Sequence, residues 1–255
     1  IMFGTHVAFF SLEMSKTEIG NRILASRSSV STYALQNADI KENDWNQISS
    51  ALAVLSPAPF YIDDRSGINT IEMMAKCRQL KNEGKLGLII IDYMQLMSSA
   101  GSRSSGNRQQ EISEISRALK IMAKELEVPV IALSQLSRGA EYREDRRPLL
   151  ADLRDSGAIE QDADMVIFIY RDKYYDTSAE KPEIEDAEII LAKNRQGATK
   201  TVMMKWQARK TLFFEPDLPA SPDESQVPRD LVHNSLPADY QDIPDFAIPV
   251  ENGDL

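Results

Sequence analysis

Three short polar segments, each directly after an apolar run, carry side chains suited to phosphate chemistry. They are Ser11-Leu12-Glu13-Met14, Asp92-Tyr93-Met94-Gln95 and Ser134-Gln135-Leu136-Ser137-Arg138. In open α/β sheets, ligands bind beyond the carboxyl ends of the strands. The polar residues that follow these apolar runs are therefore the first candidates for a binding or catalytic site.

Each candidate has a chemical interpretation and a purely structural one. An acid after several apolar strand residues, as at Asp92, is the Walker B arrangement, which delivers a carboxylate to magnesium on nucleotide phosphates. An aspartate that caps a turn gives the same pattern. Glu13 fits either a base that activates water or an acid at a helix N-terminus. Gln135 fits either a γ-phosphate sensor or a solvent-facing turn residue.

The elements that must position these residues alternate along the chain. Ser15 and Glu18 have the spacing of a capping box, which predicts a helix start. Further helices are predicted at Glu42 to Leu55, Thr70 to Lys81 and Arg108 to Glu127. Strands are predicted at Val7 to Phe10, Phe60 to Ile62, Leu86 to Ile91, Val128 to Leu133 and Met165 to Tyr170.

The last three of these strands are continuously apolar. That pattern predicts burial on both faces, as parallel sheets require, and alternation with helices indicates an α/β sheet with right-handed crossovers. Three closely spaced strands near the end predict an antiparallel edge added to that sheet. They are Glu185 to Ala192, Thr199 to Trp206 and Thr211 to Phe214.

Composition narrows the class of protein. The 255 residues contain one cysteine, Cys77, and two histidines, His6 and His233, which disfavours a disulfide or a zinc site. No apolar run is long enough to span a membrane, and no signal peptide is visible. The net charge is -10, and residues 216–255 carry -8 of it, from nine acids and one arginine. The proline-rich composition of this tail predicts that it is disordered. We expect residues 1–215 to form one globular domain.

Five segments, in order, resemble motifs of the DnaB family of bacterial replicative helicases. They are Phe9-Phe10-Ser11-Leu12-Glu13-Met14-Ser15, Leu88-Ile89-Ile90-Ile91-Asp92-Tyr93-Met94-Gln95-Leu96, Ala132-Leu133-Ser134-Gln135-Leu136-Ser137-Arg138, the run from Asp152 to Asp164, and Lys193-Asn194-Arg195-Gln196-Gly197. The resemblance covers the body of the chain and not the tail.

The resemblance implies a RecA-like, ATP- and Mg²⁺-dependent motor that forms a homo-hexamer around single-stranded or forked DNA. It makes Glu13 the catalytic base, Asp92 the magnesium ligand and Gln135 the γ-phosphate sensor. It places Arg22 near the nucleotide. It makes Lys193 and Arg195 two cations that act on the nucleotide of the neighbouring subunit. The loop that holds DNA contains Arg154, Asp155 and Gly157. Primase and a helicase loader are possible partners, in the cytoplasm, with no membrane contact. The alternatives from the residues alone are a helix-surface arginine for Arg22, a solvated basic pair for Lys193 and Arg195, and a turn or helix start for Gly157. For the arginines from Arg138 to Arg147 two interpretations remain: they line a DNA channel, or they belong to a solvated loop.

One motif of the family does not occur. The phosphate-binding P-loop has the form G-x-x-x-x-G-K-[ST], and no such string is present. The Gly84-Lys85 pair fits a turn. We therefore expect an N-terminally truncated motor domain without the amino-terminal collar. Two other hypotheses stay open, namely a different RecA-like ATPase, and a pseudo-ATPase that binds DNA or joins a ring without turnover.

Overall fold

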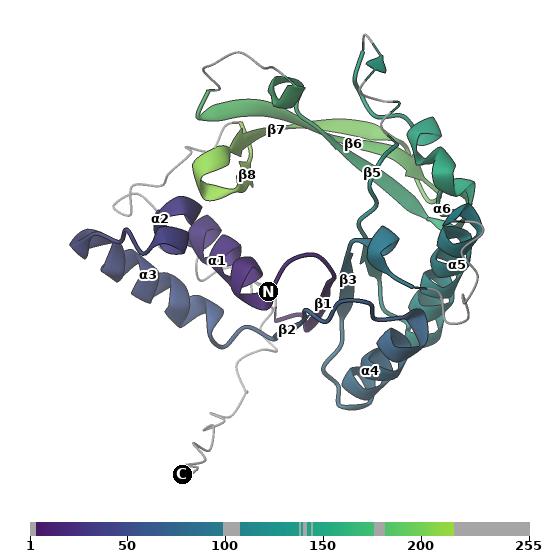
Figure 1. The fold of residues 1–255 in the computed structure, drawn as a ribbon, viewed down its shortest axis with the longest axis horizontal. Helices are drawn as coiled ribbons and strands as arrows, with labels where there is room; N and C mark the ends of the chain where they lie inside the picture. Colours follow the sequence, from purple (N-terminus) through teal and green to yellow (C-terminus); the bar gives the residue numbers. More distant parts are fainter. Residues whose placement is uncertain are drawn as a thin grey trace. The chain divides into compact units, whose positions relative to one another are not determined.

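Two four-stranded sheets, one parallel and one antiparallel, carry the described part of the chain (Figure 1). The computed structural model describes residues 4–98, 108–137, 139, 142–143, 145–175 and 182–216. The predicted tail lies, after its first residue, outside the described residues. The predicted α/β fold class is confirmed by this architecture.

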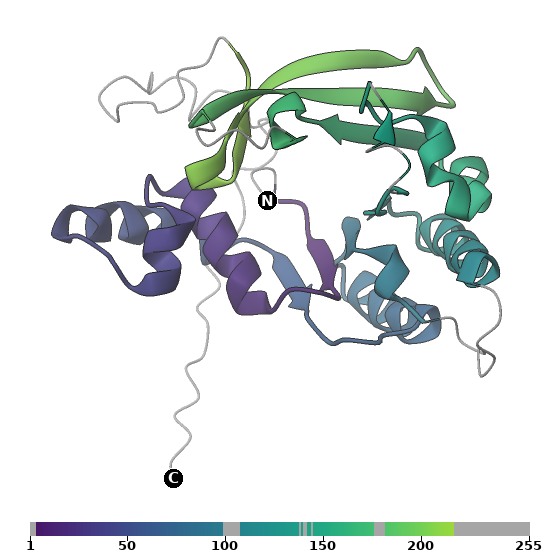
Figure 2. The same cartoon turned by 45° about the horizontal axis from the view of Figure 1, so that its top comes forward.

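The parallel sheet has the strand order β2-β1-β3-β4. Its strands are β1 (Val7–Ser11), β2 (Phe60–Asp63), β3 (Leu88–Asp92) and β4 (Val130–Ala132). The antiparallel sheet has the order β5-β6-β7-β8, drawn most clearly in Figure 2. Its strands are β5 (Met165–Tyr170), β6 (Ile184–Asn194), β7 (Lys200–Gln207) and β8 (Leu212–Phe214).

Helices begin where the sequence supplies capping side chains. In α1 (Lys16–Arg27) the predicted capping box forms, because Ser15 Oγ accepts from the Glu18 amide and Glu18 accepts from the Ser15 amide. In α4 (Thr70–Asn82) the Asn69 side chain accepts from two first-turn amides. The other α-helices of the described residues are α2 (Thr32–Asn37), α3 (Glu42–Leu55), α5 (Arg108–Leu126) and α6 (Gly157–Asp162). Short 3-10 helices are η1 (Met94–Leu96), η3 (Leu150–Ser156), η4 (Asp172–Tyr175) and η5 (Ala208–Lys210).

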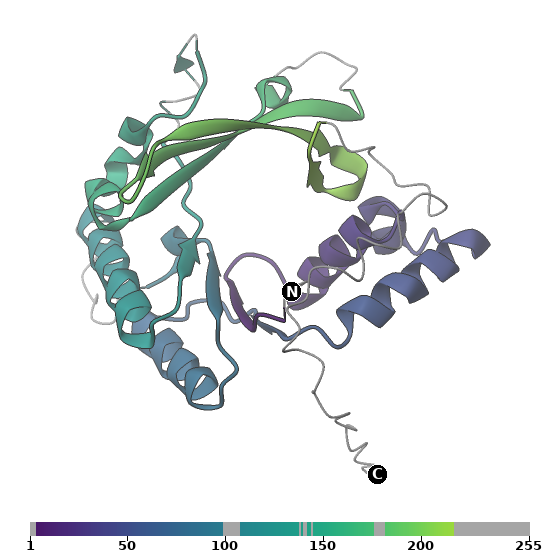
Figure 3. The same ribbon diagram turned by 180° about the vertical axis from the view of Figure 1, so that it is seen from behind.

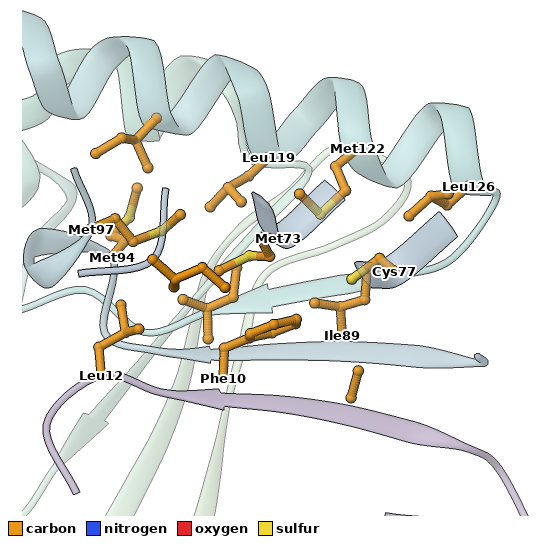
Figure 4. Close-up of a cluster of buried hydrophobic side chains, with 14 of the residues drawn as sticks. Phe10, Leu12, Met73, Cys77, Ile89, Met94, Met97, Leu119, Met122 and Leu126 are labelled. Atoms are coloured by element: carbon orange, nitrogen blue, oxygen red, sulfur yellow. The ribbon is translucent and has the colours of Figure 1, made fainter. Parts of the chain in front are cut away.

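The main core lies between one face of the parallel sheet and the helices α4 and α5 (Figure 4). One face of α5 points into this core. Its buried apolar residues are three or four positions apart, as in an amphipathic helix: Ile112, Ile115, Leu119, Met122 and Leu126. Phe10 and Ile89 meet them from the sheet, and Cys77 from α4. This packing fixes the strand ends that follow Phe10 and Ile91.

Two predictions about the sheets are wrong in detail. The strands β5 to β8 form a sheet of their own, and β5 pairs with β6 in antiparallel fashion, so they do not extend the parallel sheet as an added edge. The strands β4 and β5 are also not buried on both faces, since Ile131 is 52% exposed and Ile167 is 55% exposed. An apolar run shows that a strand can be buried, but burial also needs a partner strand and a cover on each face. Among the described residues, β4 pairs with β3 alone, and about half of Ile131 and of Ile167 stays exposed.

Candidate active site

Parallel register brings the ends of β1, β3 and β4 to one edge of the sheet. Ser11 lies beside Asp92, and the amide of Leu12 donates to the Asp92 carbonyl at 2.7 Å. The amide of Met94 donates to the Leu133 carbonyl at 3.0 Å. The predicted strand-end residues therefore share one site, which we call the strand-end edge, formed by Glu13, Asp92, Gln95 and Gln135.

Two carboxylates make this edge electronegative. Burial raises the pKa of the half-buried Asp92, and the negative charge of Glu13 raises it further, while the positive charge of Arg22 opposes both. Glu13 is exposed in the turn between β1 and α1, and Arg22 is exposed on α1. Glu13 and Arg22 are therefore both close enough to Asp92 to change its pKa. A cation or a positively charged side chain would be attracted there.

Gln135 is held through its backbone by a residue that sequence reasoning gave no role. The Gln95 amide nitrogen donates to Ser134 Oγ at 2.8 Å and to the Gln135 carbonyl at 3.0 Å. The Gln95 amide oxygen accepts from the Gln135 amide at 3.2 Å. We call this arrangement the Gln95 clamp. It leaves the Gln135 side chain exposed beyond β4. The only sequence signal was the position of Gln95, three residues after Asp92.

Lys193 and Arg195 lie apart from the strand-end edge, at the end of β6, against the C-terminus of α6. Lys193 Nζ donates to the carbonyls of Glu160 at 2.5 Å and Ala163 at 2.9 Å. Carbonyls at a helix C-terminus are unpaired and carry partial negative charge, so a cation satisfies them. Neither Lys193 nor Arg195 forms a hydrogen bond or ion pair with Glu13, Asp92 or Gln135.

Arg195 is held beside Lys193 by a carboxylate. Its guanidinium contacts the Gln161 carbonyl and lies 3.3 Å from Asp164. Lys120 from α5 also contacts Asp164, and mainly for that reason the pKa of Asp164 is lowered. The basic pair is therefore anchored and is not a loosely solvated surface pair.

The predicted DNA-holding loop coincides with η3 and the start of α6. Gly157 is the first residue of α6, with a helical φ of -50°, so its place at a helix start is clear and its conformation needs no glycine. The side chains of Arg154 and Asp155 lie outside the described residues. Just before them, Asp152 is buried and accepts from the Leu149 amide at 2.7 Å and from Arg143 at 2.6 and 2.7 Å.

Two arginines of the segment before η3 form ion pairs. Arg143 binds Asp152, and Arg147 binds Glu188 of β6. The solvated-loop interpretation therefore does not describe these two arginines. Arg138 lies outside the described residues.

No ready-made metal cage exists in the part of the chain that the structure describes, because no three His, Cys, Asp or Glu side chains gather there. Asp92 nevertheless suits Mg²⁺, which keeps several waters and takes one or two protein carboxylates. The raised pKa of Asp92, caused in part by Glu13, marks a position where a cation would relieve repulsion. Among the described helices, none has the length and apolar character needed to cross a membrane.

Comparison with known proteins gives one consistent answer. Residues 2–215 match the family model of the DnaB-like helicase C terminal domain. The chain is 48% identical over 222 residues to the replicative DNA helicase DnaC of Bacillus subtilis, covering 87% of this chain and 48% of that protein. It is also 48% identical over 223 residues to the replicative DNA helicase DnaB of Geobacillus stearothermophilus, with 88% and 48% covered.

Solved structures agree with this match and confirm the predicted RecA-like fold. A solved ATPase domain superposes with a TM-score of 0.76 at 40% identity, over 83% of this chain and 74% of that one. A DnaB-like replicative helicase, solved in work on its interactions with primase, has the same score and identity, with 52% of its chain covered. This chain spans about half the length of the curated relatives named above. It belongs to the DnaB-like helicase C-terminal domain family.

Proposed function

We propose that this chain is the motor part of a replicative DNA helicase that hydrolyses ATP and moves along single-stranded DNA in the 5′ to 3′ direction, unwinding forked duplex in the cytoplasm. The observation that carries the proposal is the strand-end edge. There Glu13 and Asp92 form an electronegative pair, and the Gln95 clamp fixes Gln135 at the next strand end. Family membership supports the same activity.

Glu13 acts as the base. It accepts a proton from the water that attacks the γ-phosphorus, while the bond from that phosphorus to the bridging oxygen breaks and ADP leaves. Its exposed position in the β1–α1 turn leaves it free to approach a substrate. Arg22 is close enough to Asp92 to lower its pKa, and its positive charge offsets part of the negative charge of the bound nucleotide.

Asp92 would hold Mg²⁺, which neutralises phosphate charge when it is bound. Asp92 must be ionised for this role, and its raised pKa means that proton competition begins at a higher pH than for an ordinary aspartate. Gln135 contacts the γ-phosphate and reports its loss through β4 and the loop that follows. The Gln95 clamp is the positioning device for this response.

Lys193 and Arg195 act on the nucleotide of a neighbouring subunit in a homo-hexamer. A guanidinium stabilises charge that spreads over the transferred phosphoryl group, and its supply from a neighbour couples hydrolysis to the ring. Their anchoring on α6 supports this role, because α6 begins with Gly157 of the DNA-holding loop. Movement of Arg154, Asp155 and Gly157 along the DNA backbone would thereby follow the neighbour's hydrolysis. Primase and a loader are further partners, and primase is named with one structural relative.

The test uses a chimera in which residues 2–215 replace their counterparts in the Geobacillus stearothermophilus helicase. The chimera is expected to hydrolyse ATP with stimulation by single-stranded DNA and to unwind a fork with a 5′ tail. Glu13→Gln should lower hydrolysis by roughly 10²–10⁴-fold with nucleotide binding retained. Hydrolysis by Glu13→Gln at the full rate would show that Glu13 is not the base.

A second candidate function is favoured by the absence of a P-loop string from the sequence. In that case the chain binds DNA or joins a ring without turning over ATP. Little else in the sequence would cradle a triphosphate, since the P-loop supplies the backbone amides and the lysine that do so. A nucleotide-binding titration of the chain alone decides, because tight magnesium-dependent ATP binding rules out this candidate.

A further inference from the structure

The turn that carries Glu13 leads from the end of β1 into α1 and is held on its strand side (Figures 1 and 3). The Leu12 amide donates to the Asp92 carbonyl of β3 at 2.7 Å. The hydroxyl of Ser11, which is buried at the end of β1, donates to the Met14 carbonyl at 2.6 Å. The backbone on both sides of Glu13 is therefore tied to the ends of β1 and β3.

On the helix side, the same turn is tied to a third strand. Asp64, the residue after β2, accepts from the Lys16 amide at 2.9 Å. Lys16 is the first residue of α1, and an amide in the first turn of a helix has no acceptor within that helix. A carboxylate there also suits the partial positive charge of the helix N-terminus. The capping box supplies the Ser15 and Glu18 amides, so Asp64 adds a tertiary contact that the local sequence does not provide.

The preceding carboxylate fixes the place from which Asp64 reaches α1. Asp63 pairs with Phe10 in the parallel register of β1 and β2. It accepts from the Arg65 amide at 3.2 Å and forms an ion pair with Lys76 of α4. Burial raises the pKa of Asp63, but hydrogen bonds from Lys76 and Arg65 outweigh burial and hold the pKa below its usual range. Asp63 is therefore ionised at neutral pH and keeps the end of β2 in place.

The capped amide is close to Glu13 along the chain. Lys16 is three residues after Glu13, and the Ser11 and Leu12 contacts lie on the other side of Glu13. Without the Asp64 contact, the start of α1 and the turn before it lose one of their two supports. The place of the Glu13 carboxylate relative to Asp92 then becomes less defined.

We propose that Asp64 is a positioning residue for Glu13, because its bond to the Lys16 amide holds the β1–α1 turn against the strand-end edge. The function of Glu13 as a base rests on the proposed function, whereas the hold of Asp64 on the turn does not. A base must be aligned closely with the attacking water, and a misplacement of about 1 Å can lower a rate about 10²-fold. Loss of this one bond should therefore slow hydrolysis and leave nucleotide binding, which depends on other groups, unchanged.

Amide hydrogen exchange of the chain alone tests the contact. In Asp64→Ala the Lys16 amide should exchange about tenfold faster or more, whereas Asp64→Asn should keep its protection, because the amide oxygen of asparagine still accepts. The Ser28 amide, which donates to the Leu24 carbonyl at 2.7 Å at the far end of α1, should stay protected in both variants. Unchanged exchange at Lys16 in Asp64→Ala would overturn the contact, and loss at Ser28 would overturn an effect confined to the turn.

DNA-stimulated ATP hydrolysis by the chimera tests the positioning. Asp64→Ala should lower kcat about tenfold or more with KM for ATP changed less than about twofold, and Asp64→Asn should restore most of kcat. Asp44→Ala is the matched control. Asp44 accepts from the Lys41 amide at 3.0 Å at the start of α3, so this variant loses a comparable carboxylate–amide bond at a helix that does not follow Glu13. Its kcat should equal that of the parent chimera.

A double variant shows whether Asp64 acts through Glu13. In Glu13→Gln, the addition of Asp64→Ala should lower hydrolysis by less than about twofold, because the base that Asp64 positions is already absent. A further tenfold loss in the double variant, a parent-like kcat in Asp64→Ala, or an equal loss in Asp44→Ala would overturn the inference.

Failure of the proposed function gives a different result. In that outcome Glu13→Gln alone hydrolyses ATP at the full rate, or the parent chimera does not hydrolyse it. The exchange of the Lys16 amide, measured without nucleotide, still decides whether Asp64 holds the turn.

Discussion

Removal of the Gln95 clamp should loosen Gln135 without unfolding the chain. In Gln95→Ala, three hydrogen bonds of 2.8, 3.0 and 3.2 Å are lost together. A neutral hydrogen bond stabilises a protein by about 0.5–1.5 kcal/mol net, and partners near the surface recover part of this from water. We therefore expect a loss of about 1–2 kcal/mol and a fall in Tm of roughly 2–8 °C for a domain of this size.

The site-specific result is the exchange of one amide. Among the described residues, the Gln135 amide donates to the Gln95 side chain alone, so in Gln95→Ala it should exchange at nearly the rate of an unprotected amide. Gln95→Glu serves as the matched control, because its carboxylate can still accept from the Gln135 amide while the two donated bonds are lost. Protection of Gln135 should survive in Gln95→Glu and disappear in Gln95→Ala. Equal protection in the parent chain and Gln95→Ala would refute the clamp.

Three further predictions concern the core and the charged edge. Ile89→Ala, at a fully buried position, should lower the free energy of unfolding in denaturant by about 2–5 kcal/mol, whereas Ile71→Ala, on the surface, should lower it by less than about 0.5 kcal/mol. Similar losses in both variants would contradict the core as described. Burial raises the pKa of Cys77 to about 12, so a thiol reagent at neutral pH should modify it only after unfolding, and rapid modification of the folded chain would be inconsistent with its burial. Because the pKa of Asp92 is higher in the folded chain than in the unfolded one, its ionised form opposes folding at neutral pH. Asp92→Asn should therefore raise Tm at pH 7, and this gain should shrink as the pH falls through the raised pKa. A lower Tm of Asp92→Asn at pH 7 would contradict the direction of the pKa shift.

Local signals were sufficient for most helices. The capping box of Ser15 and Glu18 forms as predicted, and α3 has the predicted bounds Glu42–Leu55, because caps and helical periodicity depend on neighbours in the sequence. Strand exposure was not predictable in this way. An apolar run such as that of β4 indicates which faces can be buried, but the cover comes from distant parts of the polypeptide.

The candidate site was predictable in its residue types and only partly in its contacts. Glu13 and Asp92 were identifiable because each follows an apolar strand, and the shared edge follows from parallel register. The role of Gln95 depends on β3 and β4 being adjacent, which no local pattern reveals. Likewise, the Glu160 and Ala163 carbonyls that anchor Lys193 lie about thirty residues away in sequence, so the pattern could not separate an anchored cation from a solvated one.

We propose that each active site combines Glu13 of one subunit with Arg195 of the next. The most direct measurement is DNA-stimulated ATP hydrolysis by rings of the chimera assembled from equal amounts of Glu13→Gln and Arg195→Ala subunits. Each variant alone should be nearly inactive. In random mixed rings, about one site in four joins an intact Glu13 to an intact Arg195, so roughly a quarter of the parent activity should return. Mixed rings that stay as inactive as the separate variants would contradict the claim.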